Sequence, residues 1–274
     1  MVPADLKIAD AVEAAAWSDC LAAAPVALEC SVLKVPGAEA TLLRTAAVAV
    51  PMMNRIIGWP ADTAPTDEAL AWVRQAYLDA DIDGCWIHAW DLPGGSPLSD
   101  GLAARGARAD AGARWLKFLF DLEKSPPGAR TDATLSVRPA RADEAQLAGE
   151  IICRVFGLPP IMEPWLGSLV NRRNWRMFFA CDADGNPVAT GAVFIDGDRA
   201  WLGMGTTLPE ARQRGAQQML LAARLAAAKA AGCVVAAIET GVALDGAVNH
   251  SLNNIRRAGF DEVGLRINYL YQTG

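Results

Sequence analysis

The second half of the chain alternates apolar runs with short polar turns. Residues 188–195 (VATGAVFI) and 199–208 (RAWLGMGTTL) are separated by Asp-Gly-Asp, and Asp-Gly-Asn-Pro precedes the first of them. Gly and Asn reach positive φ at little cost, so these turns predict hairpins. The remaining pattern predicts strands over 133–139, 175–182, 233–240 and 264–271, and helices over 142–156, about 215–231 and 249–258. This order indicates an α/β fold with a mixed sheet flanked by helices.

The two halves of the chain resemble each other. Residues 76–91 and 224–239 both contain the end of a helix, then Gly-Cys, then an apolar strand closed by a carboxylate, at an offset of 148 residues. The similarity continues downstream, where 102–107 corresponds to 255–260 and 114–120 to 266–271. We interpret this order as an internal duplication. The alternative is two independent α/β domains whose similarity arose by chance.

A polar segment with two prolines and a glycine, residues 121–133, interrupts the hydrophobic pattern and is the expected linker. The expected domains are residues 1–128 and 129–274, since 274 residues with 52% hydrophobic content can form two ordinary cores. The net charge is −7 up to residue 133 and +1 after it. The acidic first half is therefore a poor site for a phosphate-rich ligand.

Composition excludes several functional classes. A net charge of −6 argues against nucleic-acid binding, which needs a surplus of Lys and Arg. Charged residues or prolines interrupt every apolar run before it could span a membrane, and we see no targeting signal, so we expect a cytoplasmic protein. The six cysteines are scattered without a CxxC pair and there are two histidines, so we expect no metal site. A homodimer is left open.

The most informative segment is the elbow PEARQRGAQQ, residues 209–218, between a strand and a long helix. Gly215 permits backbone conformations closed to other residues, and the helix that begins there directs unpaired N–H groups outward. Arg212 and Arg214 add positive charge at the same point, which favours binding of a pyrophosphate. The alternative is a solvated turn without a ligand.

Residues 134–274, with a strand, an R-x-x-G turn, a helix, another strand and SLNNIRRAGF, resemble the Gcn5-related N-acetyltransferase (GNAT) family. The whole chain resembles its tandem bacterial members, which implies two GNAT-like domains, the first degenerate, each a mixed, mostly antiparallel sheet flanked by helices. The resemblance implies that acetyl-CoA is the co-substrate and that a small-molecule or peptide amine is the acceptor. The positions it assigns to cofactor binding are Gly205, Thr206, Thr207, Arg212, Gln213, Arg214, Gly215, Ala216, Gln217, Ser251 and Asn254.

Two positions depart from the family pattern. Gln217 stands where the family has Gly or Ala, and Ile255 stands where many members have a tyrosine that protonates the departing thiolate. Protonation of the departing thiolate then depends on Ser251 or on water, or the transfer proceeds without a general acid. These departures keep open an alternative function, a CoA-binding sensor or scaffold without turnover.

A general base is also required, because an ammonium group has no lone pair with which to attack a thioester. Glu239 closes the strand 233–240, at the strand end that splays near the acetyl group in the resembling fold, and is the candidate base. It could instead cap nearby backbone N–H groups. We expect His250 to be a solvated loop residue without a catalytic role.

The first half lacks the features of the elbow. The offset of 148 places Asp67 and Glu68 opposite Gly215 and Ala216, so carboxylates occupy positions where a pyrophosphate needs amides and cations. Thr66 is instead the expected N-cap of an ordinary helix, and we expect this domain not to bind CoA. Packing is the expected role of five tryptophans of this half, rather than ligand stacking: Trp59, Trp72, Trp86, Trp90 and Trp115.

Overall fold

The structure, a computed structural model, describes residues 3–125, 134–242 and 249–274. Its contacts divide the chain into two compact units. Unit 1 contains Met1–Lys117, Thr240–Ala247 and Val263–Gly274, and unit 2 contains Phe118–Glu239 and Val248–Glu262. The expected linker falls largely on residues 126–133, outside the described residues, so the expected division after residue 128 stays a prediction.

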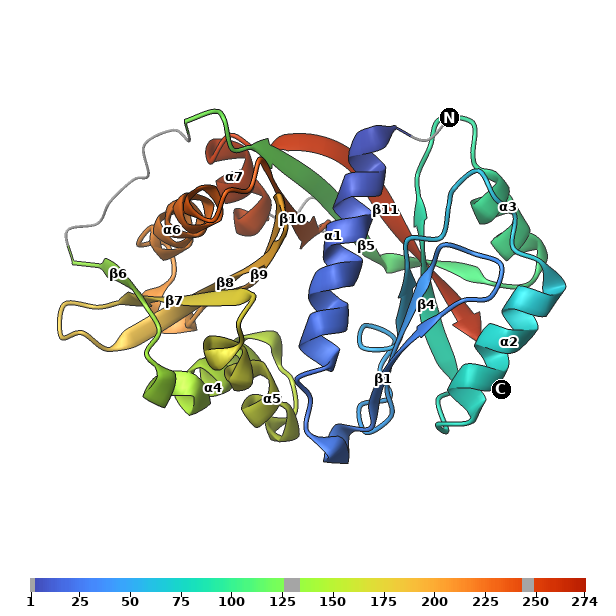
Figure 1. The fold of residues 1–274 in the computed structure, drawn as a ribbon, viewed down its shortest axis with the longest axis horizontal. Coiled ribbons are helices and arrows are strands. Elements are labelled where there is room, and N and C mark those ends of the chain that lie inside the picture. Colours follow the sequence, from blue (N-terminus) through green and yellow to red (C-terminus); the bar gives the residue numbers. More distant parts are fainter. Residues whose placement is uncertain (1–2, 126–133, 243–248) are drawn as a thin grey trace. The chain divides into compact units, whose positions relative to one another are not determined.

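Unit 1 contains a sheet of strand order β1-β2-β3-β4-β11-β5 (Figure 1). Its strands are β1 (Cys30–Lys34), β2 (Thr41–Thr45), β3 (Arg55–Ile57), β4 (Gly84–Trp90), β11 (Asp261–Gln272) and β5 (Arg108–Asp121), and its helices are α1 (Ala4–Leu21), α2 (Asp67–Leu78) and α3 (Pro97–Ala104). Strands β3 and β4 are parallel, whereas β1–β2, β2–β3 and β4–β11 are antiparallel.

Alternate residues of β4 face two different environments. Cys85, Ile87 and Ala89 join the hydrophobic core that packs under α2 and α3. Trp90 points to the opposite face, where its indole Nε1 donates a hydrogen bond to Asp10 Oδ2 of α1 at 2.7 Å. The period of two in a strand thus places an apolar layer on one side of the sheet and a more polar layer under α1 on the other.

The last strand of the chain, β11, belongs to unit 1 over most of its length. Its register with β4 runs from Arg266 opposite Trp90 to Gln272 opposite Gly84. The sequence analysis instead assigned residues 266–271 to the second domain, together with the strand at 233–240. That assignment of the strand is corrected here, because an apolar pattern shows which faces of a strand are buried but does not specify its partner.

A buried ionic cluster lies beneath α1. Glu13 is fully buried and accepts hydrogen bonds from Lys117 of β5 and Arg266 of β11, with Arg55 of β3 at 3.9 Å. Burial alone would raise the pKa of Glu13, but the charges of Arg266, Lys117 and Arg55 hold it well below its usual value. One carboxylate therefore joins α1 to three strands of this unit.

Unit 2 contains the end of β5 followed by the strand order β10-β9-β8-β7-β6. Its strands are β6 (Ser136–Pro139), β7 (Trp175–Cys181), β8 (Pro187–Asp196), β9 (Arg199–Thr207) and β10 (Val235–Gly241), and its helices are α4 (Ala145–Phe156), α5 (Glu163–Ser168), α6 (Ala216–Ala230) and α7 (His250–Arg257). Strands β6 to β9 form antiparallel neighbours, and β9–β10 is parallel. Short 3-10 turns lie at Val26–Leu28 in unit 1 and at Ala142–Glu144, Pro160–Met162, Leu169–Asn171 and Pro209–Ala211 in unit 2.

The mixed α/β fold class and most expected elements of the second half are confirmed. The expected helix at 142–156 is observed as a short turn followed by α4, and the expected helix at about 215–231 is α6. Helices α1 and α5 were not anticipated. No helix in the described ranges is long and apolar enough to cross a membrane.

Candidate functional site

Strands β9 and β10 pair only over their first halves. The parallel register runs from Arg199 opposite Val235 to Leu202 opposite Ile238, yet β9 continues to Thr207 and β10 to Gly241. Beyond Leu202 and Ile238, the backbone groups of β9 and β10 form no hydrogen bonds with one another in the β9–β10 register. Glu239 is the first residue of β10 past that point and is half-buried.

The continuing part of β9 is irregular on its other side too. The register with β8 shifts between Thr190 and Ala192, and Met204 has a φ of 51°. Thr190 Oγ1 donates to the Met204 carbonyl at 2.8 Å and lies 2.6 Å from Thr206 Oγ1. The side chain of Thr206 is therefore occupied within the sheet, and only its backbone is available for the contact expected with a cofactor. Gly205 is exposed.

The elbow has the geometry of an anion cradle. Gln213 and Gly215 both have positive φ, 66° and 86°, and Gly215 is the N-cap of α6 without a side-chain cap hydrogen bond. The first N–H groups of this 15-residue helix are thus left without the usual Ser, Thr, Asp or Asn cap. Such groups, together with the helix dipole, favour a phosphate.

Both arginines of the elbow precede this helix start. Arg212 Nε donates to the Thr207 carbonyl at 3.3 Å, and Arg214 Nη2 donates to Thr134 Oγ1 at 2.7 Å. Both contacts are exposed, so the guanidinium groups can reorient toward a ligand at modest cost. Ala211 and Ala216 anchor the elbow by packing into a buried apolar cluster with Leu220.

Helices α6 and α7 meet through three of the expected site residues. Gln217 Nε2 donates to Ser251 Oγ at 3.0 Å, and Asn254 Nδ2 donates to Gln217 Oε1 at 2.7 Å. Ile255 is fully buried, so this position supplies only apolar packing. Many members of the resembling family have a tyrosine there that acts as a general acid. His250 is exposed at the start of α7. Among the described residues, no group of His, Cys, Asp and Glu could hold a metal ion.

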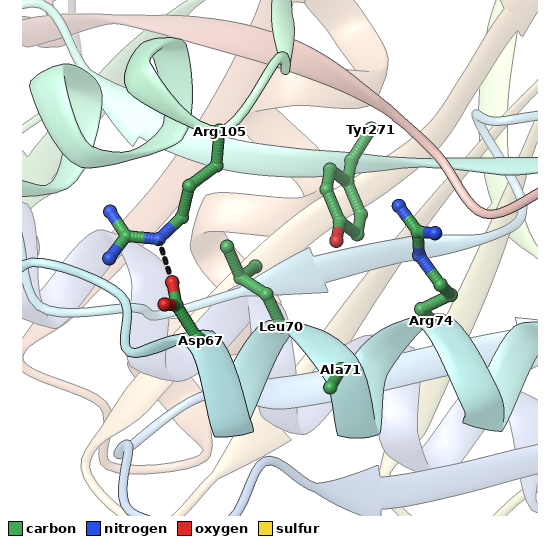
Figure 2. A pocket seen from close by; sticks show the side chains of 6 residues that line it. All are labelled: Asp67, Leu70, Ala71, Arg74, Arg105 and Tyr271. Atoms are coloured by element: carbon green, nitrogen blue, oxygen red, sulfur yellow. Dashed lines mark hydrogen bonds and ion pairs between the residues drawn. The ribbon is translucent and has the colours of Figure 1, made fainter.

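Helix α2 of unit 1, whose start the sequence aligns with that of α6, has the side-chain cap that α6 lacks. Thr66 is the N-cap of α2, and its Oγ1 accepts from the Ala69 N–H at 3.1 Å, which confirms the predicted cap. Asp67 accepts from Arg105 Nε at 2.6 Å. A cavity of about 290 Å³ lies here, lined by Asp67, Leu70, Ala71, Arg74, Arg105 and Tyr271 (Figure 2).

Figure 2 shows the carboxylate of Asp67 turned toward Arg105 at one end of this cavity, and Tyr271 beside Arg74 at the other end. The start of α2 in unit 1 thus has a side-chain cap and a carboxylate, whereas the start of α6 in unit 2 has no side-chain cap. Trp59 and Trp90 are buried and Trp72 packs against the unit 1 core, in line with the expected packing role. Trp86 and Trp115 are partly buried.

Sequence reasoning missed one residue beside the candidate site. Arg224 of α6 is 1% exposed and donates from Nη1 to the Gly203 carbonyl of β9 at 3.2 Å. The available signal was its spacing, since Leu220, Leu221, Arg224, Leu225 and Ala228 form the buried face of α6. An arginine in an apolar helical stripe indicates a specific buried partner.

Comparison with known proteins identifies the domain around this site. Residues 145–242 match the family model described as acetyltransferase (GNAT) domain. Among solved structures, the chain is similar to a GCN5-related N-acetyltransferase from Kribbella flavida at 17% identity and a TM-score of 0.64, with 95% of this chain and 94% of that chain covered.

Two further structures show the same fold over nearly the whole chain. One is a GCN5-related N-acetyltransferase from Sphaerobacter thermophilus, at 15% identity and a TM-score of 0.64, covering 100% of this chain and 94% of that one. The other is a tandem GNAT protein from the clavulanic acid biosynthesis pathway, at 14% identity and a TM-score of 0.59, with 95% of each chain covered. No curated protein sequence matches.

Proposed function

We propose that the chain transfers the acetyl group of acetyl-CoA to an amine, because residues 145–242 match the acetyltransferase (GNAT) domain model. The observation that carries the proposal is the elbow, where two arginines and two residues of positive φ directly precede the uncapped start of α6. These features fit the pyrophosphate of CoA. The part of β9 beyond its pairing with β10 fits the pantetheine arm of CoA, because the backbone groups on that strand edge can exchange hydrogen bonds with the amide groups of the arm.

In the proposed reaction the acceptor nitrogen attacks the thioester carbonyl, and backbone N–H groups of β9 stabilise the negative charge that develops on the carbonyl oxygen. Glu239 accepts the proton that the amine must lose, directly or through a water. The carbon–sulfur bond then breaks and CoA leaves as its thiolate. Ile255 cannot protonate that thiolate, so Ser251 or water is the proposed donor.

One observation favours the alternative of a CoA sensor or scaffold. The Gln217 amide already bridges Ser251 and Asn254, which are two of the residues expected near the pantetheine. If this bridge persists with CoA bound, Ser251 and Asn254 are held against Gln217 instead of the pantetheine, although Ser251 accepts in the bridge and keeps its own hydroxyl proton. Titration of released thiol, with acetyl-CoA and a panel of primary amines and polyamines, distinguishes the two functions, because only an enzyme releases CoA in step with amine consumption.

The binding step has a direct test in the variant Gly215→Asp. The substitution places a carboxylate and a Cβ at the proposed pyrophosphate site, so acetyl-CoA affinity should fall at least 100-fold in calorimetry. The wild-type chain should bind one acetyl-CoA, since the start of α2 is capped by Thr66 and carries Asp67.

The matched control is Gly185→Asp, which makes the same substitution at a glycine of φ 85° with nothing within 4 Å of its Cβ position, in the turn between β7 and β8. It should keep wild-type affinity. Wild-type affinity in a folded Gly215→Asp variant would contradict the proposed site, and a stoichiometry near two would contradict the proposed inactivity of unit 1.

A further inference from the structure

Arg224 is a buried cation without a carboxylate partner. Its Nε donates to the Leu220 carbonyl of the same helix at 3.1 Å and its Nη1 to the Gly203 carbonyl at 3.2 Å, and no ion pair of Arg224 occurs in the described ranges. Burial lowers the pKa of Arg224 to about 10, so the side chain stays charged at neutral pH. Burying a charge without a counter-ion is costly, so its position calls for a specific explanation.

Two glycines accommodate this side chain. A Cβ at Gly191 of β8 would lie 2.9 Å from Arg224 Nε and 3.1 Å from its Cζ. A Cβ at Gly205 of β9 would lie 3.7 Å from both terminal nitrogens. The guanidinium therefore lies against the stretch where the β8–β9 register shifts and where β9 has no further pairs with β10.

The contact with Gly203 has a chemical consequence for the next residue. The chain contains no cis peptide in its described ranges, so the N–H of Met204 points away from the Gly203 carbonyl and away from Arg224. A cation that binds a carbonyl oxygen polarises the whole peptide group and makes its N–H a stronger donor. Arg224 thus restrains the orientation of the 203–204 peptide and makes the Met204 N–H a stronger donor.

We propose that Arg224 is a positioning residue for acyl transfer, which holds the Gly203–Met204 peptide so that its N–H polarises the thioester carbonyl. This role rests on the proposed acetyl-CoA function. If Arg224 served stability alone, through its bonds to the Leu220 and Gly203 carbonyls, its replacement would change stability without changing the carbonyl band of bound acetyl-CoA.

The test compares Arg224→Met with wild type by isotope-edited infrared spectroscopy of bound acetyl-CoA that carries ¹³C at the thioester carbonyl. A stronger donor weakens the C=O bond, so the carbonyl band of bound acetyl-CoA should lie below that of free acetyl-CoA in the wild type. In Arg224→Met the band should return toward the free value, with acetyl-CoA affinity within about threefold of wild type. With an amine that supports turnover, kcat should fall about tenfold or more and KM should change little.

Two further variants complete the experiment. Lys229→Met removes a positive charge from an exposed position of the same helix and should leave the band and kcat unchanged. Arg224→Lys keeps the charge, but a lysine ammonium cannot reach the Leu220 and Gly203 carbonyls together as the guanidinium does. The band should therefore move toward the free value by a smaller amount than in Arg224→Met. Arg224→Lys replaces Arg224→Met in the comparison if the Met variant does not fold.

A wild-type band and a wild-type kcat in folded Arg224→Met, or in Arg224→Lys where the Met variant does not fold, would overturn the role of Arg224 while leaving acetyl-CoA function intact. Absence of acetyl-CoA binding by the wild type would overturn the proposed function and this role with it.

Discussion

At the scale of single residues, Gln217 has the most unusual setting in the candidate site. It stands at a position where the resembling family has Gly or Ala, and its amide joins α6 to Ser251 and Asn254 of α7. An amide has both a donor and an acceptor, so one side chain can hold a hydroxyl and a second amide at the same time. The departure from the family pattern is therefore compensated by hydrogen bonds within unit 2.

Glu239→Gln tests the proposed base. The substitution keeps the shape of the side chain and removes its basic lone pair, so turnover should fall by ~10²- to 10⁴-fold while acetyl-CoA affinity holds. Steady-state kinetics with released thiol as the readout measures this, with Glu150→Gln, an exposed glutamate of the same unit outside the candidate site, as the control. A variant that melts several degrees lower yet turns over at the wild-type rate would identify Glu239 as a structural cap.

Asp10 predicts a pH dependence of stability. Burial raises the pKa of Asp10 from 3.8 to about 6, so between these values the folded chain keeps a proton that the unfolded chain has released. Stability should therefore fall as pH rises through this window, by about 1.4 kcal/mol for each unit of pKa difference. Asp10→Asn removes this titration and leaves an oxygen to accept from Trp90.

The melting temperature of Asp10→Asn, relative to wild type, should be higher at pH 7.5 than at pH 4. A constant offset between Asp10→Asn and wild type from pH 4 to 8 would contradict the raised pKa.

At the scale of elements, the close contact of α4 with α5 depends on two glycines. A Cβ at Gly149 would lie 2.0 Å from the Glu163 carbonyl oxygen, and a Cβ at Gly167 would lie 2.2 Å from that of Ala145. The two backbones are therefore in direct contact. No side chain other than hydrogen fits at either position without separating the helices.

Gly149→Ala should destabilise unit 2, although alanine favours helix formation, because the added methyl group meets a backbone atom that cannot rotate away. Overpacking of this kind typically costs about 1–3 kcal/mol, or roughly 2–4 °C in melting temperature per kcal/mol for a chain of this size. Differential scanning calorimetry measures the effect. Gly112→Ala, where the nearest atom is the Asp110 carboxylate at 3.5 Å, should change the melting temperature little. Equal melting temperatures for both variants would show that α4 and α5 adjust freely.

At the scale of the whole molecule, the two compact units do not follow the order of the chain. Residues 263–274 come last in sequence and lie in unit 1, where β11 is hydrogen-bonded to β4. Arg266 and Asn268 of this strand are fully buried, and Arg266 donates to Glu13 of the first helix. The first and last elements of the chain thus stabilise the same unit.

Deletion of residues 263–274 should therefore unfold unit 1. Hydrogen exchange followed by mass spectrometry should show loss of protection in β4 and α2, with β7 and β8 retaining theirs. Removal of Gly274 alone, an exposed terminal residue, is the control and should change neither region. Preferential loss of protection in β7 and β8 would mean that the last strand stabilises the second unit, as the sequence analysis assumed.

Local features of the fold can be predicted from neighbouring residues. The Asp-Gly turns define the hairpins of unit 2, because glycine reaches positive φ cheaply, and Thr66 defines the start of α2, because its hydroxyl satisfies an N–H group that the helix leaves unpaired. The elbow at 212–215 was found in the same way, from a glycine and two arginines before a helical run. Each of these features depends on residues within a few positions of one another.

Contacts between distant elements could not be predicted in this way. The pattern of β11 is consistent with pairing in either half, because alternation specifies the buried face of a strand and not its neighbour. Likewise, the position of Arg224 in an apolar stripe predicts that it is buried, but not that it contacts the Gly203 carbonyl. The sequence shows only that Gln217 differs from the family pattern, and its hydrogen bonds with Ser251 and Asn254 depend on the packing of α7 against α6. Hydrogen bonds across 21 to 37 residues of sequence depend on how whole elements pack, and that packing is a property of the entire fold.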